Sequence, residues 1–223
     1  MQRRSLIHAG LAFGALFTTT STAEIKPVNY KNTSDIEEES SALKATDQDL
    51  MHLRRSIELS DLAPSQEYGG NPPFGAILVL ADGSVHEGWN HVFSNNDPTH
   101  HAELWLITET IKQLNLDWRG EDAGLLNGAT LYASTEPCAM CAGAMYWAGI
   151  QRLVYACSAE CFGSVFKSLF PSRTDTGLSI SSRSVFASSG RITETLGPLL
   201  EEDALRIHKR HWPEIFGIVS PFI

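Results

Sequence analysis

The first regular pattern of apolar and polar positions begins near residue 47. Leu53 and Ile57 fall on one face of a helix, which Pro64 is expected to end. Thr46 stands three residues before Asp49, the spacing of a capping box at a helix start. The pattern therefore predicts a helix from about residue 47 to residue 63.

Two apolar runs follow a loop that is rich in Gly and Pro at residues 69–73. They cover residues 74–80 and 84–92, and the turn pair Asp82-Gly83 separates them. Two strands joined by such a pair form a β-hairpin, so the sequence predicts one here.

Helices and strands are predicted to alternate through the rest of the chain. A helix is expected to open after residues 97–99, with a strand at 130–134, a helix at 139–148, a strand at 153–156 and a closing helix at 199–215. Residues 158–182 show little periodicity and are expected to be irregular, and residues 185–187 are predicted as a last strand. The order is that of an α/β protein.

Composition indicates one globular domain with extensions. The chain has 223 residues, of which 43% are hydrophobic and 19% are charged, so wholesale disorder and a coiled coil are excluded. The 17 basic and 26 acidic residues give a net charge of −9, which argues against a nucleic-acid partner. No apolar run is long enough to predict a membrane span, and four cysteines are too few for a disulfide scaffold.

Residues 1–23 have the order of an export signal. Arg3 and Arg4 precede an apolar stretch at 6–17, acidic residues are absent, and Ala23 suits cleavage before Glu24. The arginine pair resembles a twin-arginine signal, so an exported, periplasmic or secreted protein is predicted. An ordinary first helix or an organelle transit peptide is the alternative. A polar linker at 24–46 is expected to follow.

Two short motifs carry the chemistry. His101-Ala102-Glu103 and Pro137-Cys138-Ala139-Met140-Cys141 each lie near a predicted helix start. Cys138 and Cys141 are three residues apart, so on a helix both sulfurs point the same way. Two thiolates and the His101 imidazole suit one Zn²⁺ and leave a fourth position open, as in catalytic zinc sites. Glu103 stands where a carboxylate could transfer protons without being a ligand.

A structural zinc site that binds a partner protein is the rival interpretation. It requires a fourth ligand, for which His86, His91 and His100 are the candidates, and it gives Glu103 no role. Either motif alone would be weak, because a single C-x-x-C has several uses. The two motifs together favour the catalytic interpretation.

Residues 47–216 resemble the cytidine deaminase-like superfamily, in which H-x-E and P-C-x-x-C form the zinc signature. Pro73-Phe74-Gly75-Ala76, Asn96-Asp97-Pro98-Thr99 and the segment 135–145 are similar to its purine-deaminating branch, and residues 146–148 are similar to guanine deaminases. The resemblance implies a three-layer α-β-α sandwich around a mixed five-stranded sheet, a short tail at 217–223 and hydrolytic deamination. Glu103 would pass the protons.

The resemblance also implies roles for residues beyond the metal. Asn90 would form a hydrogen bond with the base, and the aromatic side chains of Phe74 and Trp147 would pack against its ring. Ala102 would contact the substrate. A turn position for Asn90 and core positions for Phe74 and Trp147 are the alternatives. Relatives of this kind are commonly homodimers, so a dimer is expected.

The expected substrate is a small nucleobase, nucleoside or related heterocyclic amine, with a guanine-type purine first and tRNA adenosine as the alternative. Guanine deaminases carry a base-contacting aspartate downstream, whereas residues 160–167 of this chain contain none. Cys157 and Cys161 are expected to be unlinked thiols, with a disulfide or a reactive pair as the alternative.

Overall fold

The computed structural model describes residues 44–117, 126–173, 177–178 and 180–217. The predicted export signal, all but the end of the predicted linker, and residues 218–223 of the tail lie outside this part. Among the described helices, none combines the length and the apolar character that crossing a membrane requires.

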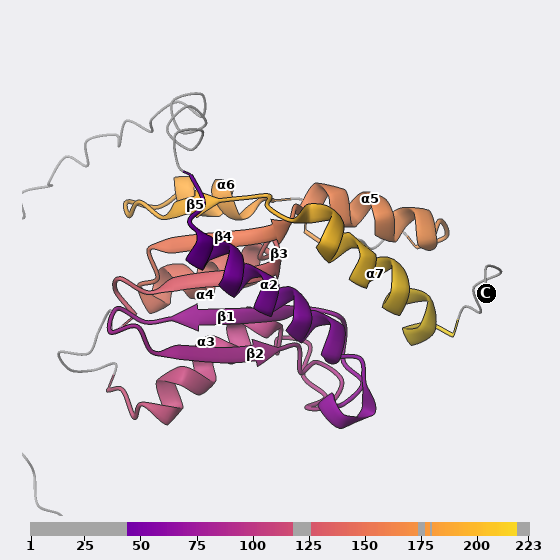
Figure 1. Ribbon diagram of the computed structural model, residues 1–223, viewed down its shortest axis with the longest axis horizontal. Helices are drawn as coiled ribbons and strands as arrows, with labels where there is room; N and C mark the ends of the chain where they lie inside the picture. Colours follow the sequence, from indigo (N-terminus) through magenta and orange to yellow (C-terminus); the bar gives the residue numbers. More distant parts are fainter. Residues whose placement is uncertain (1–43, 118–125, 174–176, 179, 218–223) are drawn as a thin grey trace, which may run out of the picture.

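The centre of the fold is a mixed five-stranded sheet (Figure 1). Its strands run β2-β1-β3-β4-β5 across the sheet, and β1 is antiparallel to both its neighbours, while β3, β4 and β5 are parallel. The bounds are Gly75–Val79 for β1, Val85–Trp89 for β2, Thr130–Thr135 for β3, Arg152–Cys157 for β4 and Glu194–Leu196 for β5. This is the sheet that the resemblance implied.

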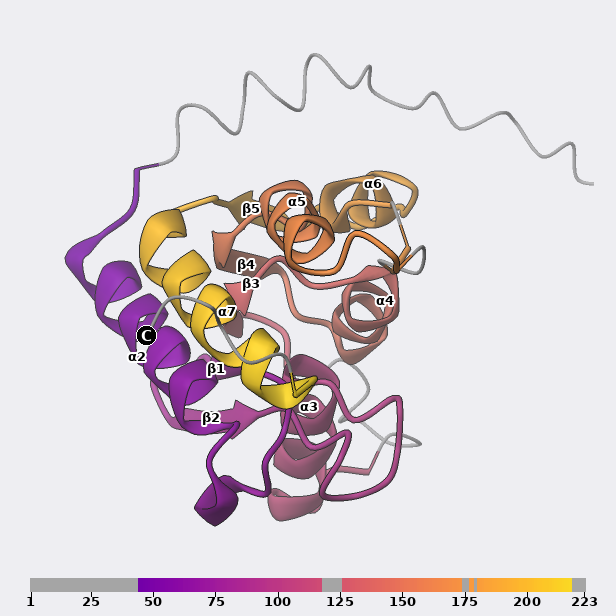
Figure 2. The same cartoon turned by 90° about the vertical axis from the view of Figure 1, so that its right-hand side faces the viewer.

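Helices cover both faces of the sheet (Figures 1 and 2). Helices α2 (Asp47–Leu62) and α7 (Glu201–Ile215) pack on one face, and α3 (Ala102–Gln113), α4 (Ala139–Ala148) and α6 (Ser182–Ala187) pack on the other. Helix α5 (Ala159–Leu169) packs beside α7, and a short 3-10 helix, η1 (Gln66–Tyr68), precedes β1. The three-layer α-β-α sandwich is confirmed.

The predicted start of the first helix and the predicted hairpin are confirmed. The Thr46 hydroxyl accepts from the Asp49 N–H at 3.1 Å, and the Asp49 carboxylate accepts from the Thr46 N–H at 2.9 Å. Strands β1 and β2 pair around Asp82-Gly83, where Gly83 has φ +85°, a conformation that glycine adopts without strain.

Two predictions in the C-terminal third were wrong. Residues 158–182 contain α5, in which Phe162 and Phe166 recur four residues apart and face Trp212 of α7. This helical period was obscured by the Ser and Gly residues between the apolar positions. Residues 185–187 are the end of helix α6, which the Ser181 side chain caps, and the last strand is β5. A three-residue edge strand is too short for a pattern to distinguish.

Strand register gathers several segments at one end of the sheet. Ala76 of β1 pairs with Ala133 of β3, and Thr135 of β3 pairs with Cys157 of β4. The start of β1 therefore lies at the carboxyl ends of β3 and β4, where α4 and α5 begin. Gly75 is required at this point, because a Cβ there would lie 2.3 Å from the Ser56 carbonyl oxygen of α2.

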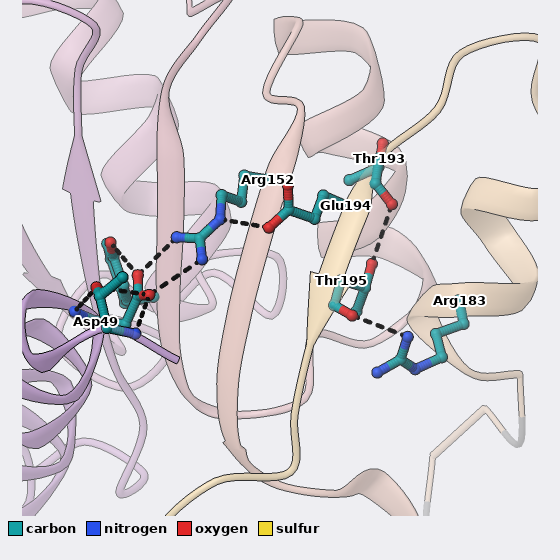
Figure 3. Close-up of polar contacts among 8 residues, drawn as sticks. Asp49, Arg152, Arg183, Thr193, Glu194 and Thr195 are labelled. Carbon is teal, nitrogen blue, oxygen red and sulfur yellow. Dashed lines mark hydrogen bonds and ion pairs between the residues drawn. The ribbon is translucent and has the colours of Figure 1, made fainter. Parts of the chain in front are cut away.

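The opposite end of the sheet is held by a buried carboxylate on α2 (Figure 3). Arg152 donates to both oxygens of Asp49, at 2.6 and 3.1 Å, and to Glu194 at 2.7 Å, while the Tyr132 hydroxyl also donates to Asp49. Burial alone would raise the pKa of Asp49, but hydrogen bonds from Arg152, Thr46 and Tyr132 hold it well below its usual range. Asp49 thus ties α2 to β3 and β4, and Arg152 extends the network to β5.

Asp49→Asn is expected to lower the free energy of unfolding by about 3 kcal/mol at pH 7, because it breaks a buried ion pair. A depressed folded-state pKa stabilises the protein above the unfolded pKa of about 3.9 and loses that effect as pH falls through the folded value. The free energies of unfolding of the wild type and of Asp49→Asn, measured with urea, should therefore become more similar below about pH 4. Glu58→Gln, which removes an exposed pair with Arg55, should cost less than about 0.5 kcal/mol. An equal loss in both variants would contradict the assignment.

Candidate metal centre and active site

Three metal-ligating side chains meet where α3 and α4 begin. His101 is the N-cap residue of α3, Cys138 is the N-cap residue of α4, and Cys141 lies in the first turn of α4. The Cys138 sulfur lies 3.7 Å from His101 Nδ1 and 3.8 Å from the Cys141 sulfur, and all three ligand atoms lie within 4.8 Å of one another. The structure thus brings together the three ligands that the sequence predicted.

The electrostatics of these side chains fit a zinc site. Hydrogen bonds with Cys141 and His101 lower the pKa of Cys138 to about 4. The pKa of Cys141 is raised instead, by its hydrogen bond with Cys138 and by burial. Cys138 therefore gives up its proton more readily than Cys141, and zinc binding releases the protons that remain on the two sulfurs. Two thiolates and an imidazole are a ligand set that zinc prefers.

Glu103 lies beside the three ligands and is buried, with 7% of its surface exposed. Burial raises the pKa of its carboxyl group, and the nearby Cys138 sulfur raises it further. It is not part of the ligand cluster. A buried carboxyl group with a raised pKa can both accept and donate a proton near neutral pH.

The fourth ligand that a structural zinc site requires is not found among the described residues. The cluster contains none of the three candidate histidines. His100 is bound instead by Asn95 and Asp97, and the His91 ring stacks on Trp105 with centroids 3.9 Å apart. The open fourth position agrees with a catalytic site.

Asn90 lies in the loop that leads into α3 and is buried. Its backbone N–H donates to the Phe74 carbonyl oxygen, and its side-chain oxygen accepts from the Val92 N–H at 2.9 Å. Buried Asn71 holds the same loop, because its side-chain oxygen accepts from the N–H groups of Phe93 and Ser94. These bonds leave the amide nitrogen of Asn90 free to donate to a substrate.

Phe74 and Ala102 differ in what they offer a substrate. Phe74 is half-buried at the start of β1, and its ring contacts Phe162 and His208 with centroids 5.6 and 5.1 Å away. The Ala102 side chain is fully buried in the core, so only its backbone N–H, unpaired at the start of α3, remains for binding. Their roles toward a base stay predictions.

Trp147 lies on the same helix as the two cysteine ligands, and its side chain is exposed. It lies in the last turn of α4, nine residues beyond Cys138, which corresponds to roughly 13 Å along a helix. Its side chain packs edge-on against Tyr146, and 73% of the residue is exposed. A wall made by Trp147 therefore remains a prediction, and an exposed position suits a contact with another chain better than a wall of this site.

Glu136 is an important residue to which the sequence gave no separate role. Its carboxylate accepts from the Ala159 N–H at the start of α5, and from the N–H and hydroxyl of Ser182 at the start of α6. It thus connects the turn before Cys138 to two further helices. None of the four cysteines, all of which lie in the described part of the chain, forms a disulfide, as expected for Cys157 and Cys161.

A three-ligand zinc site with a buried carboxyl group, at the end of a mixed sheet between two layers of helices, defines a zinc-dependent enzyme with the cytidine deaminase-like fold. Residues 46–157 match the cytidine and deoxycytidylate deaminase zinc-binding region. The chain belongs to this family of deaminases, which are hydrolases that act on C–N bonds.

Relatives differ in how much of their length the chain spans. A probable cytosine deaminase of Schizosaccharomyces pombe is 33% identical over 175 residues, which cover 77% of this chain and 97% of that protein. A guanine deaminase of Bacillus subtilis is 39% identical over 47% of this chain and 61% of its own length. A tRNA-specific adenosine deaminase of Haemophilus influenzae is 39% identical over 51% of this chain and 60% of its own length.

A solved guanine deaminase from Nitrosomonas europaea has the same fold. Its TM-score is 0.57 over 76% of this chain and 86% of its own, at 22% identity.

Cys138→Ser is expected to weaken zinc affinity more than about 100-fold, because a neutral hydroxyl replaces a thiolate ligand. Competition with a chromophoric zinc chelator measures this affinity directly. Cys161→Ser is the matched control, because Cys161 is half-buried on α5 and outside the cluster, and it should bind zinc like the wild type. Equal affinity of both variants would contradict the ligand set.

Proposed function

We propose that this protein removes the amino group of a small free nucleobase or related heterocycle by hydrolysis. The observation that carries the proposal is the position of Glu103, buried beside three zinc ligands but not among them. A structural site gives such a carboxyl group no purpose, and burying it costs free energy. In a deaminase the same group is required.

The chain's own residues supply binding and proton transfer. Zinc, when held by His101, Cys138 and Cys141, is a Lewis acid that makes water a stronger nucleophile near neutral pH. Glu103 takes a proton from water and passes it to a ring nitrogen while the water oxygen bonds to the amine-bearing carbon. It then transfers the remaining proton of that oxygen to the amino group, so that the C–N bond breaks and ammonia leaves. Asn90 donates to the base from one side, and Phe74 packs against its ring.

A free base is favoured over a polynucleotide. The net charge of −9 opposes the approach of a phosphate backbone. The likeness to a probable cytosine deaminase extends over nearly the whole of that protein. Guanine and cytosine are the first substrates to test, guanine because of the motif at residues 146–148.

Glu103→Gln is expected to retain one zinc per chain and to lose at least about 10³-fold in turnover, because proton transfer is removed while the ligands remain. Ammonia release would be measured with zinc-loaded protein on guanine, cytosine, adenine, their nucleosides and an adenosine-containing tRNA anticodon stem. Glu109→Gln, on the outer part of α3, is the control and should keep full activity.

The panel also separates the alternatives. Release from a free base but not from RNA supports the proposal, and release from RNA alone would replace it with tRNA editing. Normal turnover of Glu103→Gln would contradict the mechanism.

We also propose that the protein is a homodimer and that α4 forms part of the contact. Met140, Gly143 and Ala144 are partly exposed and share one helical face with exposed Trp147. An apolar helix face of this kind is unusual on a surface that faces only water. The face begins in the same helix turn as Cys141, so a partner there would lie near the metal site.

Gly143→Glu is expected to convert the dimer to a monomer. The variant chain should melt at the same temperature as a wild-type monomer. A Cβ at Gly143 meets no atom within 4 Å, so a single chain has room for the new side chain, whereas a packed interface does not. Gly163→Glu on α5 is the matched control, since its Cβ also meets nothing. Sedimentation velocity would report the mass, and a dimeric Gly143→Glu would place the interface elsewhere.

A further inference from the structure

His208 is a buried histidine that the proposed reaction does not use. It lies on α7 with 1% of its surface exposed, more than 60 residues along the chain from the metal ligands. Burial lowers its pKa to about 3, so the ring is neutral at any ordinary pH. A neutral imidazole in a core is less favourable than an apolar side chain of similar size unless both nitrogens are hydrogen-bonded.

Both nitrogens of His208 are bonded, and their partners fix its tautomer. The Trp212 indole Nε1–H can only donate, and it lies 3.3 Å from His208 Nδ1. The ring proton must therefore be on Nε2, which donates to the Thr135 hydroxyl oxygen at 2.7 Å. The orientation of the ring is thus determined by two bonds in opposite directions.

Thr135 connects His208 to the metal ligands. It is the last residue of β3, and it stands three residues before Cys138. Glu136 is bonded to α5 and α6, as described above, so the bond from α7 adds a third attachment to the same turn. Only Pro137 separates these two attached residues from the first cysteine.

The same imidazole ring contacts the predicted wall of the base site. The His208 ring centroid lies 5.1 Å from that of Phe74 and 4.6 Å from that of Phe162. Trp212 and Phe162 also contact Phe74, with centroids 6.0 and 5.6 Å away. Phe74 is therefore supported on one side by α5 and α7.

We propose that His208 is a positioning residue, which sets the distance between the Phe74 ring and the turn that carries Cys138. One side chain contacts both the strand end that leads to a metal ligand and the ring against which a base would pack. Its geometry determines how far the bound ring lies from the reacting centre. The kinetic part of this inference rests on the proposed function.

The test uses full-length, metal-loaded protein and variants of both bonded partners. His208→Leu and Thr135→Val remove the bond, whereas His208→Gln and Thr135→Ser each retain a donor or a hydroxyl at the same place. The first two should lose between about 10- and 100-fold in kcat/KM, because a small displacement of a bound substrate has an effect of this size. The second two should recover most of that loss.

His52→Leu is the matched control. His52 is also a buried histidine in contact with an aromatic ring, but it lies on α2 beside Tyr132. The His52→Leu variant should change the melting temperature of the protein without changing KM or kcat. The double variant His208→Leu/Thr135→Val should lose no more than either single variant, because both remove the same bond.

A second readout does not require substrate. With cobalt in place of zinc, the thiolate-to-metal absorption bands should shift in His208→Leu and Thr135→Val and remain unchanged in His52→Leu. Unchanged kinetics and unchanged bands in folded His208→Leu and Thr135→Val would show a structural role only and overturn the proposal. A wild type that is inactive on every substrate, together with shifted bands, would refute the proposed function and leave the link from His208 to the cysteines supported.

Discussion

The structure depends on keeping three ligand atoms from two helices within 4.8 Å of one another. His101 and Cys138 are both N-cap residues, so their positions are set by where α3 and α4 leave the sheet. Helix α3 follows β2 and α4 follows β3, so the registers of β2 against β1 and of β1 against β3 relate the two helix starts. A shift of one residue in either pairing would turn alternate side chains to the other face and separate the ligands.

Polar contacts at both ends of the sheet oppose such a shift. At one end, Asp49 and Arg152 join α2 to β4. At the other end, the Glu136 carboxylate accepts hydrogen bonds from residues at the starts of α5 and α6. His208 of α7 donates a hydrogen bond to Thr135, the last residue of β3. Hydrogen-bonded groups of this kind specify one arrangement more strictly than apolar packing does, because any other arrangement leaves a buried polar group without a partner.

Many individual helices and strands and the metal ligands could be predicted from local signals, whereas the mixed five-stranded sheet and its layers came from the family resemblance. The capping box at Thr46, the turn at Asp82-Gly83 and the two short motifs each need only a few neighbouring residues. Helix α5 and the role of His208 could not be predicted in this way. The Phe162 and Phe166 stripe has meaning only against α7, and His208 acquires its role from Thr135, which lies 73 residues earlier. Long-range pairing leaves no periodic pattern in one sequence.

The aromatic surroundings of Phe74 affect how bases can be distinguished. Phe162 contacts Phe74 from α5, whose residues 160–167 contain no aspartate, and both His208 nitrogens are already bonded. Among the described residues, the side chains that contact Phe74 on this side, Phe162, His208 and Trp212, offer it aromatic packing surface. Under the proposed function, hydrogen-bonding discrimination is expected from the Asn90 amide nitrogen and the Ala102 N–H. A polar edge of a base that faced the aromatic side would be left unpaired, which costs about 1–3 kcal/mol. Under the proposed function, this aromatic surface would favour a base whose polar edge can turn toward Asn90.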